Sequence, residues 1–215
     1  MSVAAKICGL STEAAVRAAI AGGAVYLGFN FYLPSPRAVT AAKAARLCAT
    51  IPAGIARVGI FVDADDDTIR AVLAEAPIDI LQFHGRESLD RIADARLRFA
   101  RPVIKAVAIA APADVLAAAR YEEVADMLLF DAKPPRRPDA LPGGNGLAFD
   151  WDLIAGRSWR REWMLSGGLT AELLPEAVRI SGAVSVDVSS GVESRPGEKD
   201  LDKIRAFLAA ARALE

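Results

Sequence analysis

The chain has 215 residues, of which 53% are hydrophobic and 25% charged, so it has enough apolar residues for a large core and enough charge for a soluble surface. Its 26 basic and 27 acidic residues leave a formal net charge of −1, which gives no support to a nucleic-acid or anionic-membrane partner. No apolar run reaches the roughly 18 residues of a membrane span. The N-terminus does not resemble a signal peptide. Two cysteines are too few for a disulfide framework, and no CxxC pair or Cys/His cluster suggests a metal site. We therefore expect a cytoplasmic protein with one domain, residues 1–215, and no metal.

Short apolar runs rich in β-forming residues recur along the chain and are predicted as strands. They lack strict polar–apolar alternation, as expected for strands covered by helices on one side and by core on the other. The eight runs are Ala4–Cys8, Ala24–Phe31, Arg57–Val62, Ile78–Phe83, Val103–Val107, Met127–Phe130, Trp163–Leu165 and Val184–Val188.

Alanine-rich stretches with helical spacing fill the gaps between these runs. They are Glu13–Ala21, Ala38–Thr50, Asp67–Ala76, Leu89–Phe99, Ala113–Arg120, Asp152–Arg157, Ala171–Ile180 and Asp200–Leu214. A strand–helix order of this kind predicts parallel strands with right-handed crossovers. An open doubly wound sheet uses the same order, but eight units in one compact chain favour an α/β fold of the single-domain (β/α)8 TIM-barrel type. A long Pro- and Gly-rich loop, residues 132–149, follows the sixth strand and so lies on the face where such barrels place active sites.

The first and sixth strands end in residues with acid–base chemistry. Cys8 follows the first strand and precedes a glycine, so its thiol can face the barrel mouth as a base or nucleophile. With an ordinary pKa of about 8.5, a base role needs only a modest lowering. Asp131, at the end of the sixth strand, is either the buried partner of a cation or a general acid. The same two roles are open to Asp63 and Asp187. For Asp187 we favour a supporting role, in which its carboxylate holds a neighbouring lysine or backbone amides. We expect Cys48 to be core and His84, the only histidine, to line the mouth without catalysing.

Two glycine-bearing loops follow the seventh and eighth strands, where these barrels often bind phosphate. Glycines let backbone N–H groups approach an anion. The predicted phosphate-binding residues are Gly167, Gly168, Ser189, Ser190 and Gly191. Arg37, in a proline-stiffened loop after the second strand, is a candidate for binding a carboxylate because a guanidinium forms a bidentate fork.

Motifs along the whole chain together resemble the phosphoribosylanthranilate isomerase family. They include Lys6–Gly9 (KICG), Gly28–Tyr32 with Ser35–Arg37, Val58–Val62, Leu81–Gly85 (LQFHG), Ile104–Val107, Leu128–Asp131, Gly143–Gly146 with Phe149–Trp151, Leu165–Leu169 and Val186–Glu193 (VDVSSGVE) with Pro196–Gly197 and Lys199–Asp200. One departure is Leu147, which stands where the family often has a lysine.

The resemblance implies a cofactor-free Amadori rearrangement, an aldose–ketose isomerisation in tryptophan biosynthesis, with a small phosphorylated molecule as substrate. It further implies that Cys8 is the general base, that Asp131 is the general acid and that Arg37 binds the anthranilate carboxylate. Backbone amides near Gly168 and Gly191 would hold the phosphate. Both a monomer and a homodimer fit such a barrel.

Three alternatives stay open at the level of the sequence. A Schiff-base aldolase would use Lys105 on the fifth strand. A phosphate-binding barrel without catalysis would bind ligand and turn nothing over, since a fold does not fix a function. A dual-substrate isomerase that also serves histidine biosynthesis usually relies on a pair of aspartates, and Cys8 argues against it.

Overall fold

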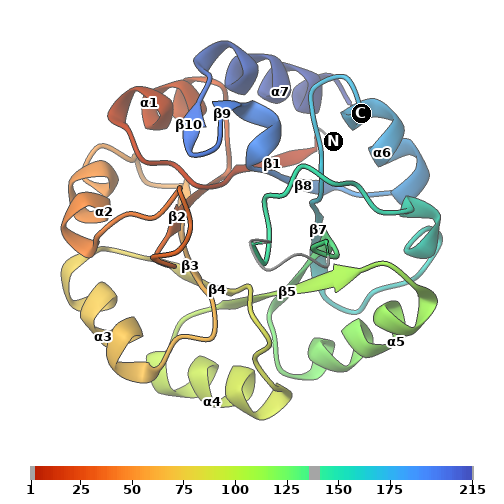
Figure 1. Ribbon diagram of the computed structural model, residues 1–215, viewed down its shortest axis with the longest axis horizontal. Helices are drawn as coiled ribbons and strands as arrows, with labels where there is room; N and C mark the ends of the chain where they lie inside the picture. The colour runs from red at the N-terminus through yellow and green to blue at the C-terminus, as the bar shows by residue number, and fades with distance from the viewer. Residues whose placement is uncertain (1–2, 136–140, 215) are drawn as a thin grey trace.

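A computed structural model describes residues 3–135 and 141–214. Eight parallel strands close into a barrel in the order β1 to β8, with β8 paired to β1, and the helices surround it (Figure 1). The prediction of an α/β, (β/α)8-barrel fold is therefore confirmed. The strands are β1 (Ala4–Ile7), β2 (Tyr26–Asn30), β3 (Ala56–Phe61), β4 (Ile80–Phe83), β5 (Val103–Ile109), β6 (Met127–Ala132), β7 (Glu162–Leu165) and β8 (Ser185–Val188).

The outer layer of the described residues contains seven α-helices. They are α1 (Glu13–Ala21), α2 (Ala41–Cys48), α3 (Asp66–Glu75), α4 (Leu89–Phe99), α5 (Pro112–Arg120), α6 (Leu174–Ser181) and α7 (Leu201–Ala213). Polar side chains cap the starts of several of them; Thr12, for example, accepts a hydrogen bond from the third residue of α1. Residues 136–140 of the predicted long loop lie outside the described residues.

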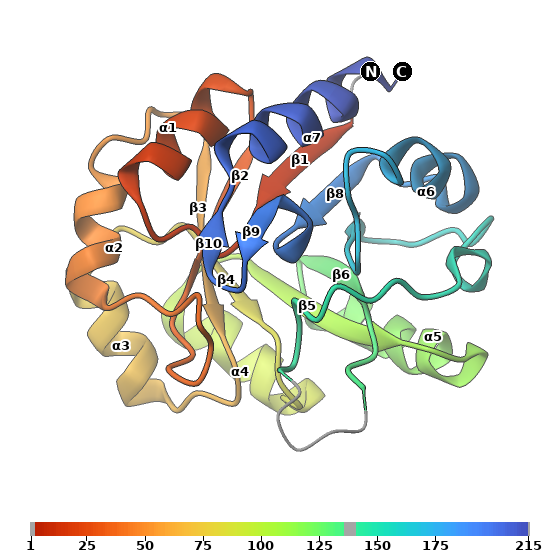
Figure 2. The ribbon, with the colours of Figure 1, turned by 45° about the horizontal axis from the view of Figure 1, so that its top comes forward.

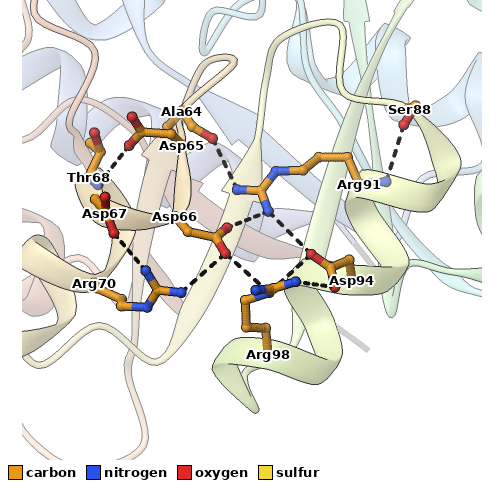
Figure 3. A network of polar contacts seen from close by, with 10 residues as sticks. All are labelled: Ala64, Asp65, Asp66, Asp67, Thr68, Arg70, Ser88, Arg91, Asp94 and Arg98. Atoms are coloured by element: carbon orange, nitrogen blue, oxygen red, sulfur yellow. Dashed lines mark hydrogen bonds and ion pairs between the residues drawn. The ribbon is translucent and has the colours of Figure 1, made fainter.

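Neighbouring helices are also tied together by charge. Asp66, at the start of α3, forms ion pairs with Arg91 and Arg98 of α4 and with Arg70 of its own helix (Figure 3). An acidic residue is favourable at this end of a helix because of the helix dipole. Since these side chains are partly exposed, the network links α3 to α4 but contributes little to the stability of the fold.

The helix predicted at Asp152–Arg157 is not formed. The chain instead makes a single 3₁₀ turn, η2 (Trp151–Leu153), before Gly156 adopts a left-handed conformation with φ of 64°. Too few residues precede that glycine for an α-helix to offset its nucleation cost. The sixth helical unit of the barrel is thus reduced to η2 and an irregular segment between β6 and β7 (Figure 1).

A small hairpin that the sequence reading missed follows β8. It pairs β9 (Glu193–Arg195) with β10 (Glu198–Lys199) across a turn that contains Gly197 at φ of 84°. The hairpin lies outside the barrel sheet, beside β1 and β2 (Figure 2). The hairpin contains Glu193 and Lys199, two charged residues of the motifs that carry the family resemblance.

Side chains alternate between the barrel interior and the helix-facing layer. An interior cluster joins buried residues of β3, β5, β6 and β7, namely Val58, Ile104, Ala106, Met127, Leu129 and Met164. Because alternate residues of a strand point to opposite faces, the same parity sends Asp131 inward and Lys105 outward.

Candidate active site

A pocket opens at the carboxyl ends of the strands. It has a volume of about 760 Å³, including its opening to solvent. It is lined by residues of β2, β3, β6 and β8 and by residues that follow β1, β2, β3, β4, β6, β7 and β8. All eight residues that the sequence singled out for chemistry or binding line it: Cys8, Arg37, Asp131, Gly167, Gly168, Ser189, Ser190 and Gly191. This is the face on which (β/α)8 barrels carry out their chemistry.

Cys8 follows β1 and is partly exposed in the pocket. Space for its sulfur comes from Gly28 on β2, where an added Cβ would lie 3.2 Å from Sγ. Burial raises the pKa of the thiol above its ordinary value, and the charges of Lys6 and Lys199 offset this only in part. The direction is opposite to the modest lowering expected for a base.

A buried ion pair underlies Cys8. Lys6 Nζ donates to Asp187 Oδ1 at 2.7 Å, and Ser166 donates to the other oxygen of Asp187 at 3.0 Å. Burial alone lowers the pKa of Lys6, but the charges of Asp187 and Cys8 outweigh it and raise the pKa. Asp187 thus supports a neighbouring lysine, as the sequence indicated.

Asp131 lies near the end of β6 and is 6% exposed. Its Oδ1 accepts a hydrogen bond from the backbone N–H of Ala132 at 2.8 Å, and its Oδ2 lies 3.1 Å from Nε2 of His84. The other ring nitrogen of His84 lies 2.9 Å from the side-chain nitrogen of Gln82, a fully buried residue of β4. The histidine therefore contacts Asp131 directly, beyond the lining role expected for it.

Arg37 is held from two sides. Its Nε and Nη2 donate to the two carboxylate oxygens of Glu193 at 2.8 and 2.9 Å, and Nη2 also donates to the Gly144 carbonyl at 3.1 Å. The bidentate edge of the Arg37 guanidinium, which the sequence analysis assigned to a substrate carboxylate, thus already binds the carboxylate of Glu193. Nη1 is the part of the guanidinium left for a ligand, since it makes no hydrogen bond to the described residues.

Glycines bring the loops around the pocket into close contact. Gly167 and Gly168 have φ of 89° and 62°, a conformation that costs glycine nothing and other residues considerably more. A Cβ on Gly168 would lie 2.7 Å from backbone atoms of Leu147 and Ala148, and one on Gly191 would collide with the carbonyl of Leu169. The loops after β6, β7 and β8 therefore pack backbone to backbone, which leaves peptide groups in the pocket wall.

Comparison with known proteins decides the family. The family model described as N-(5'-phosphoribosyl)anthranilate (PRA) isomerase matches residues 5–210. The chain belongs to this family. It is 54% identical to the N-(5'-phosphoribosyl)anthranilate isomerase of Paracoccus denitrificans over 99% of both chains, and 53% identical to that of Rhodospirillum centenum over 100% of both. Phosphoribosylanthranilate isomerase activity, a step of tryptophan biosynthesis, follows from this membership.

Solved structures of the same isomerase agree with the fold. The enzyme from Thermotoga maritima aligns with a TM-score of 0.87 and 34% identity over 99% of this chain and 100% of that one. A phosphoribosylanthranilate isomerase solved in complex with reduced 1-(o-carboxyphenylamino)-1-deoxyribulose 5-phosphate aligns with a TM-score of 0.83 and 32% identity over the same shares of the two chains.

Two charged residues considered from the sequence lie away from the pocket of the isomerase. Lys105 is 2% exposed and points outward, where it pairs with Glu87 at 2.8 Å and donates to the Gly85 carbonyl at 2.8 Å. Asp63 accepts a hydrogen bond from the Arg86 backbone at 2.7 Å. Both therefore hold the loop after β4, and Lys105 is not placed for the Schiff-base chemistry of an aldolase.

Glu193, Lys199 and Gln82 are site residues that the sequence reading did not single out. The sequence contained an indication for each of them. Gln82 lies two positions before His84 and so faces the same side of the strand, and Glu193 and Lys199 belong to motifs that carry the family resemblance. Leu147, the departure from the family pattern, lies on the rim of the pocket and is 44% exposed. No cation from that position reaches the pocket of this isomerase.

Among the helices of residues 3–135 and 141–214, none combines the length and apolar character needed to cross a bilayer. Within the same residues, no cluster of three or more His, Cys, Asp or Glu side chains is arranged to hold a metal ion.

Proposed function

We propose that Cys8 is the general base and Asp131 the general acid of the isomerisation of N-(5'-phosphoribosyl)anthranilate to 1-(2-carboxyphenylamino)-1-deoxyribulose 5-phosphate. The observation that carries the proposal is their placement at the ends of β1 and β6, with both side chains lining one pocket. Among the described residues that line it, Cys8 is the only thiol, and Asp131 is in direct contact with a histidine. Acid and base then approach the sugar from different walls.

The reaction begins with transfer of a proton from Asp131 to the furanose ring oxygen. The bond between C1' and that oxygen breaks, and the nitrogen lone pair forms a Schiff base at C1'. The thiolate of Cys8 next removes the proton from C2', and the electrons of that C–H bond form an enolamine, which becomes the ketone. Each of the two groups is expected to contribute roughly 10²–10⁴-fold to the rate, the usual range for general acid–base catalysis.

Two further groups position the substrate. Nη1 of Arg37 faces the anthranilate carboxylate, and the backbone around Gly168 and Gly191 surrounds the phosphate, with Gly167, Ser189 and Ser190 completing the cradle. Peptide N–H groups suit an anion that must be bound without a dedicated lysine. Residues 1–215 act as one catalytic domain. Cytoplasmic location and a monomeric or homodimeric state stay predictions from the sequence.

The test is turnover of freshly prepared phosphoribosylanthranilate, followed by the loss of anthranilate fluorescence. The wild type is compared with Cys8→Ser and Asp131→Asn. We expect kcat to fall by about 10²–10⁴-fold in each variant. Cys48→Ser and Asp150→Asn are the matched controls, because Cys48 is buried in α2 and Asp150 caps η2, and both should retain wild-type kcat. Activity within a few-fold of wild type in either active-site variant would remove that residue from its role.

A further inference from the structure

Three charged side chains are buried together beside the pocket. Arg37, Glu193 and Lys199 have side chains that are 6%, 4% and 2% exposed, and Glu193 forms an ion pair of 2.8 Å with each of the other two. One carboxylate thus faces two cations, so a positive charge remains unbalanced within the trio. Burying an unbalanced charge is unfavourable unless something else compensates it. An anionic ligand in the adjoining pocket would supply that compensation.

The donors of Lys199 are all used by the protein. Nζ donates to Glu193 Oε1 at 2.8 Å, to the Ser189 carbonyl at 2.8 Å and to the Ser189 hydroxyl at 3.3 Å, which accounts for the three protons of an ammonium group. The Ser189 hydroxyl in turn donates to the carbonyl of Cys8 at 3.2 Å. Lys199 therefore does not reach a ligand itself but fixes the start of the loop that carries Ser190 and Gly191.

Glu193 has the corresponding role toward Arg37. Oε1 and Oε2 accept from Nε and Nη2, and Oε2 also accepts from the backbone N–H of Gly197 at 3.3 Å, within the turn of the hairpin. This two-point grip fixes the plane of the guanidinium and directs Nη1 to the pocket. Burial raises the pKa of Glu193, but Arg37 and Lys199 outweigh burial and hold the pKa below its ordinary value, so the grip is ionic at neutral pH.

We propose that Glu193 is a positioning residue that aims Arg37 at the substrate carboxylate and, through Lys199, sets the Ser189 loop for the phosphate. The hairpin β9–β10 then couples the two anionic ends of one substrate through a single buried carboxylate. The inference rests on the proposed role of Arg37. It explains why the charged residues at Glu193 and Lys199 accompany the phosphate-loop sequence, although neither contacts the reacting atoms.

The experiment compares two substrates, phosphoribosylanthranilate and the phosphoribosyl derivative of aniline, which lacks the carboxylate. For Glu193→Gln we expect KM for the anthranilate substrate to rise about 10- to 100-fold, the range for loss of a charge-assisted hydrogen bond, and KM for the aniline substrate to change by only a few-fold. Arg37→Met should show the same selectivity, and the double variant should be no worse than Arg37→Met alone. Glu198→Gln, on the exposed part of the same hairpin, is the matched control and should alter neither KM.

A second measurement examines the phosphate end. Inorganic phosphate should inhibit the wild type competitively, and Lys199→Met should raise its inhibition constant about tenfold, as expected for loss of hydrogen bonds from a charged group. Glu198→Gln should leave that constant unchanged. An unchanged constant in Lys199→Met would overturn the coupling to the phosphate loop.

The results for the two variants distinguish the positioning role of Glu193 from the proposed carboxylate-binding role of Arg37. If Arg37→Met affects both substrates equally, the carboxylate-binding role of Arg37 is wrong and the positioning role of Glu193 falls with it. If Arg37→Met discriminates between them and Glu193→Gln does not, only the present inference is overturned. Glu193→Asp keeps the charge on a shorter side chain, and recovery of part of the selectivity in that variant is the expected result should Glu193→Gln fail to fold.

Discussion

The imidazole Nε2 of His84 lies 3.1 Å from Oδ2 of Asp131, and its Nδ1 lies 2.9 Å from the amide nitrogen of Gln82. An amide nitrogen only donates, so Nδ1 accepts and the ring proton is on Nε2. His84 thereby donates to Oδ2 of Asp131 and holds the carboxyl group in one orientation. Gln82 is fully buried inside the barrel and determines which tautomer is present, as the second hydrogen bond of a histidine generally does.

This contact predicts that His84→Ala lowers kcat for phosphoribosylanthranilate by about 10- to 100-fold. Proton transfer leaves Asp131 as a carboxylate, and a hydrogen bond to a charged group contributes roughly 1.5–3 kcal/mol. KM should change much less, since the contact is made to the acid and not to a binding group. Steady-state kinetics checks this. An effect confined to KM would mean that His84 contacts substrate instead of orienting Asp131.

The thiol of Cys8 predicts an alkaline pH profile. Burial raises the pKa of Cys8 above its ordinary value. A base acts only when deprotonated, and below that pKa the thiolate fraction increases about tenfold per pH unit. We expect both kcat/KM and the rate of alkylation by iodoacetamide to rise through neutral pH and to be rising still near pH 9. Alkylation is measured in a Cys48→Ala background, although burial raises the pKa of Cys48 to about 11. A plateau reached near neutral pH contradicts the prediction.

The sequence predicted those features that depend on local pattern. Apolar runs and helical spacing gave all eight barrel strands, and the rule that active sites lie at the carboxyl ends of the strands gave Cys8 and Asp131 as pocket residues. The helix at Asp152–Arg157 failed because a short window with helical composition does not reveal that Gly156 turns left-handed.

Contacts between distant segments could not be predicted in the same way. Arg37 and Glu193 are separated by 156 positions, and nothing in the spacing of either segment indicates that the hairpin after β8 folds over the loop after β2. The orientation of Lys105, in contrast, could have been predicted from the sequence. Alternate residues of a strand point to opposite faces, so Lys105 points away from the interior that its neighbours Ile104 and Ala106 face.

Gly144 offers a test of how tightly the loop after β6 is packed on Arg37. Gly144 and Gly156 both adopt left-handed φ, 73° and 64°, but a Cβ on Gly144 would lie 2.7 Å from Nη1 of Arg37 whereas one on Gly156 would meet nothing within 4 Å. Alanine at either position should reduce the free energy of unfolding by about 1–2 kcal/mol. Only Gly144→Ala should also raise KM, because only there does the new methyl group displace the guanidinium. Urea unfolding and steady-state kinetics on both variants decide this, and equal KM values would show that Nη1 has room to move.

The outward-facing pair of Lys105 and Glu87 predicts a structural effect without a catalytic one. Both side chains are nearly inaccessible, 3% and 2% exposed, so Lys105→Met leaves a carboxylate buried without its partner and should lower the free energy of unfolding by about 3–5 kcal/mol. Arg17→Met, which breaks an exposed ion pair with Glu13, is the matched control and should change it by no more than about 0.5 kcal/mol.

The ion pair of Lys105 and Glu87 also tests the alternative hypothesis of a Schiff-base aldolase. Adding Glu87→Gln to Lys105→Met removes the uncompensated charge and should restore part of the lost stability, since the two positions are in direct contact and their effects are not additive. Borohydride added during turnover should trap no substrate on Lys105, because its Nζ is occupied by Glu87 and by the carbonyls of Phe83 and Gly85. Reductive labelling of Lys105 that abolishes activity would contradict both its outward orientation and the cofactor-free acid–base mechanism.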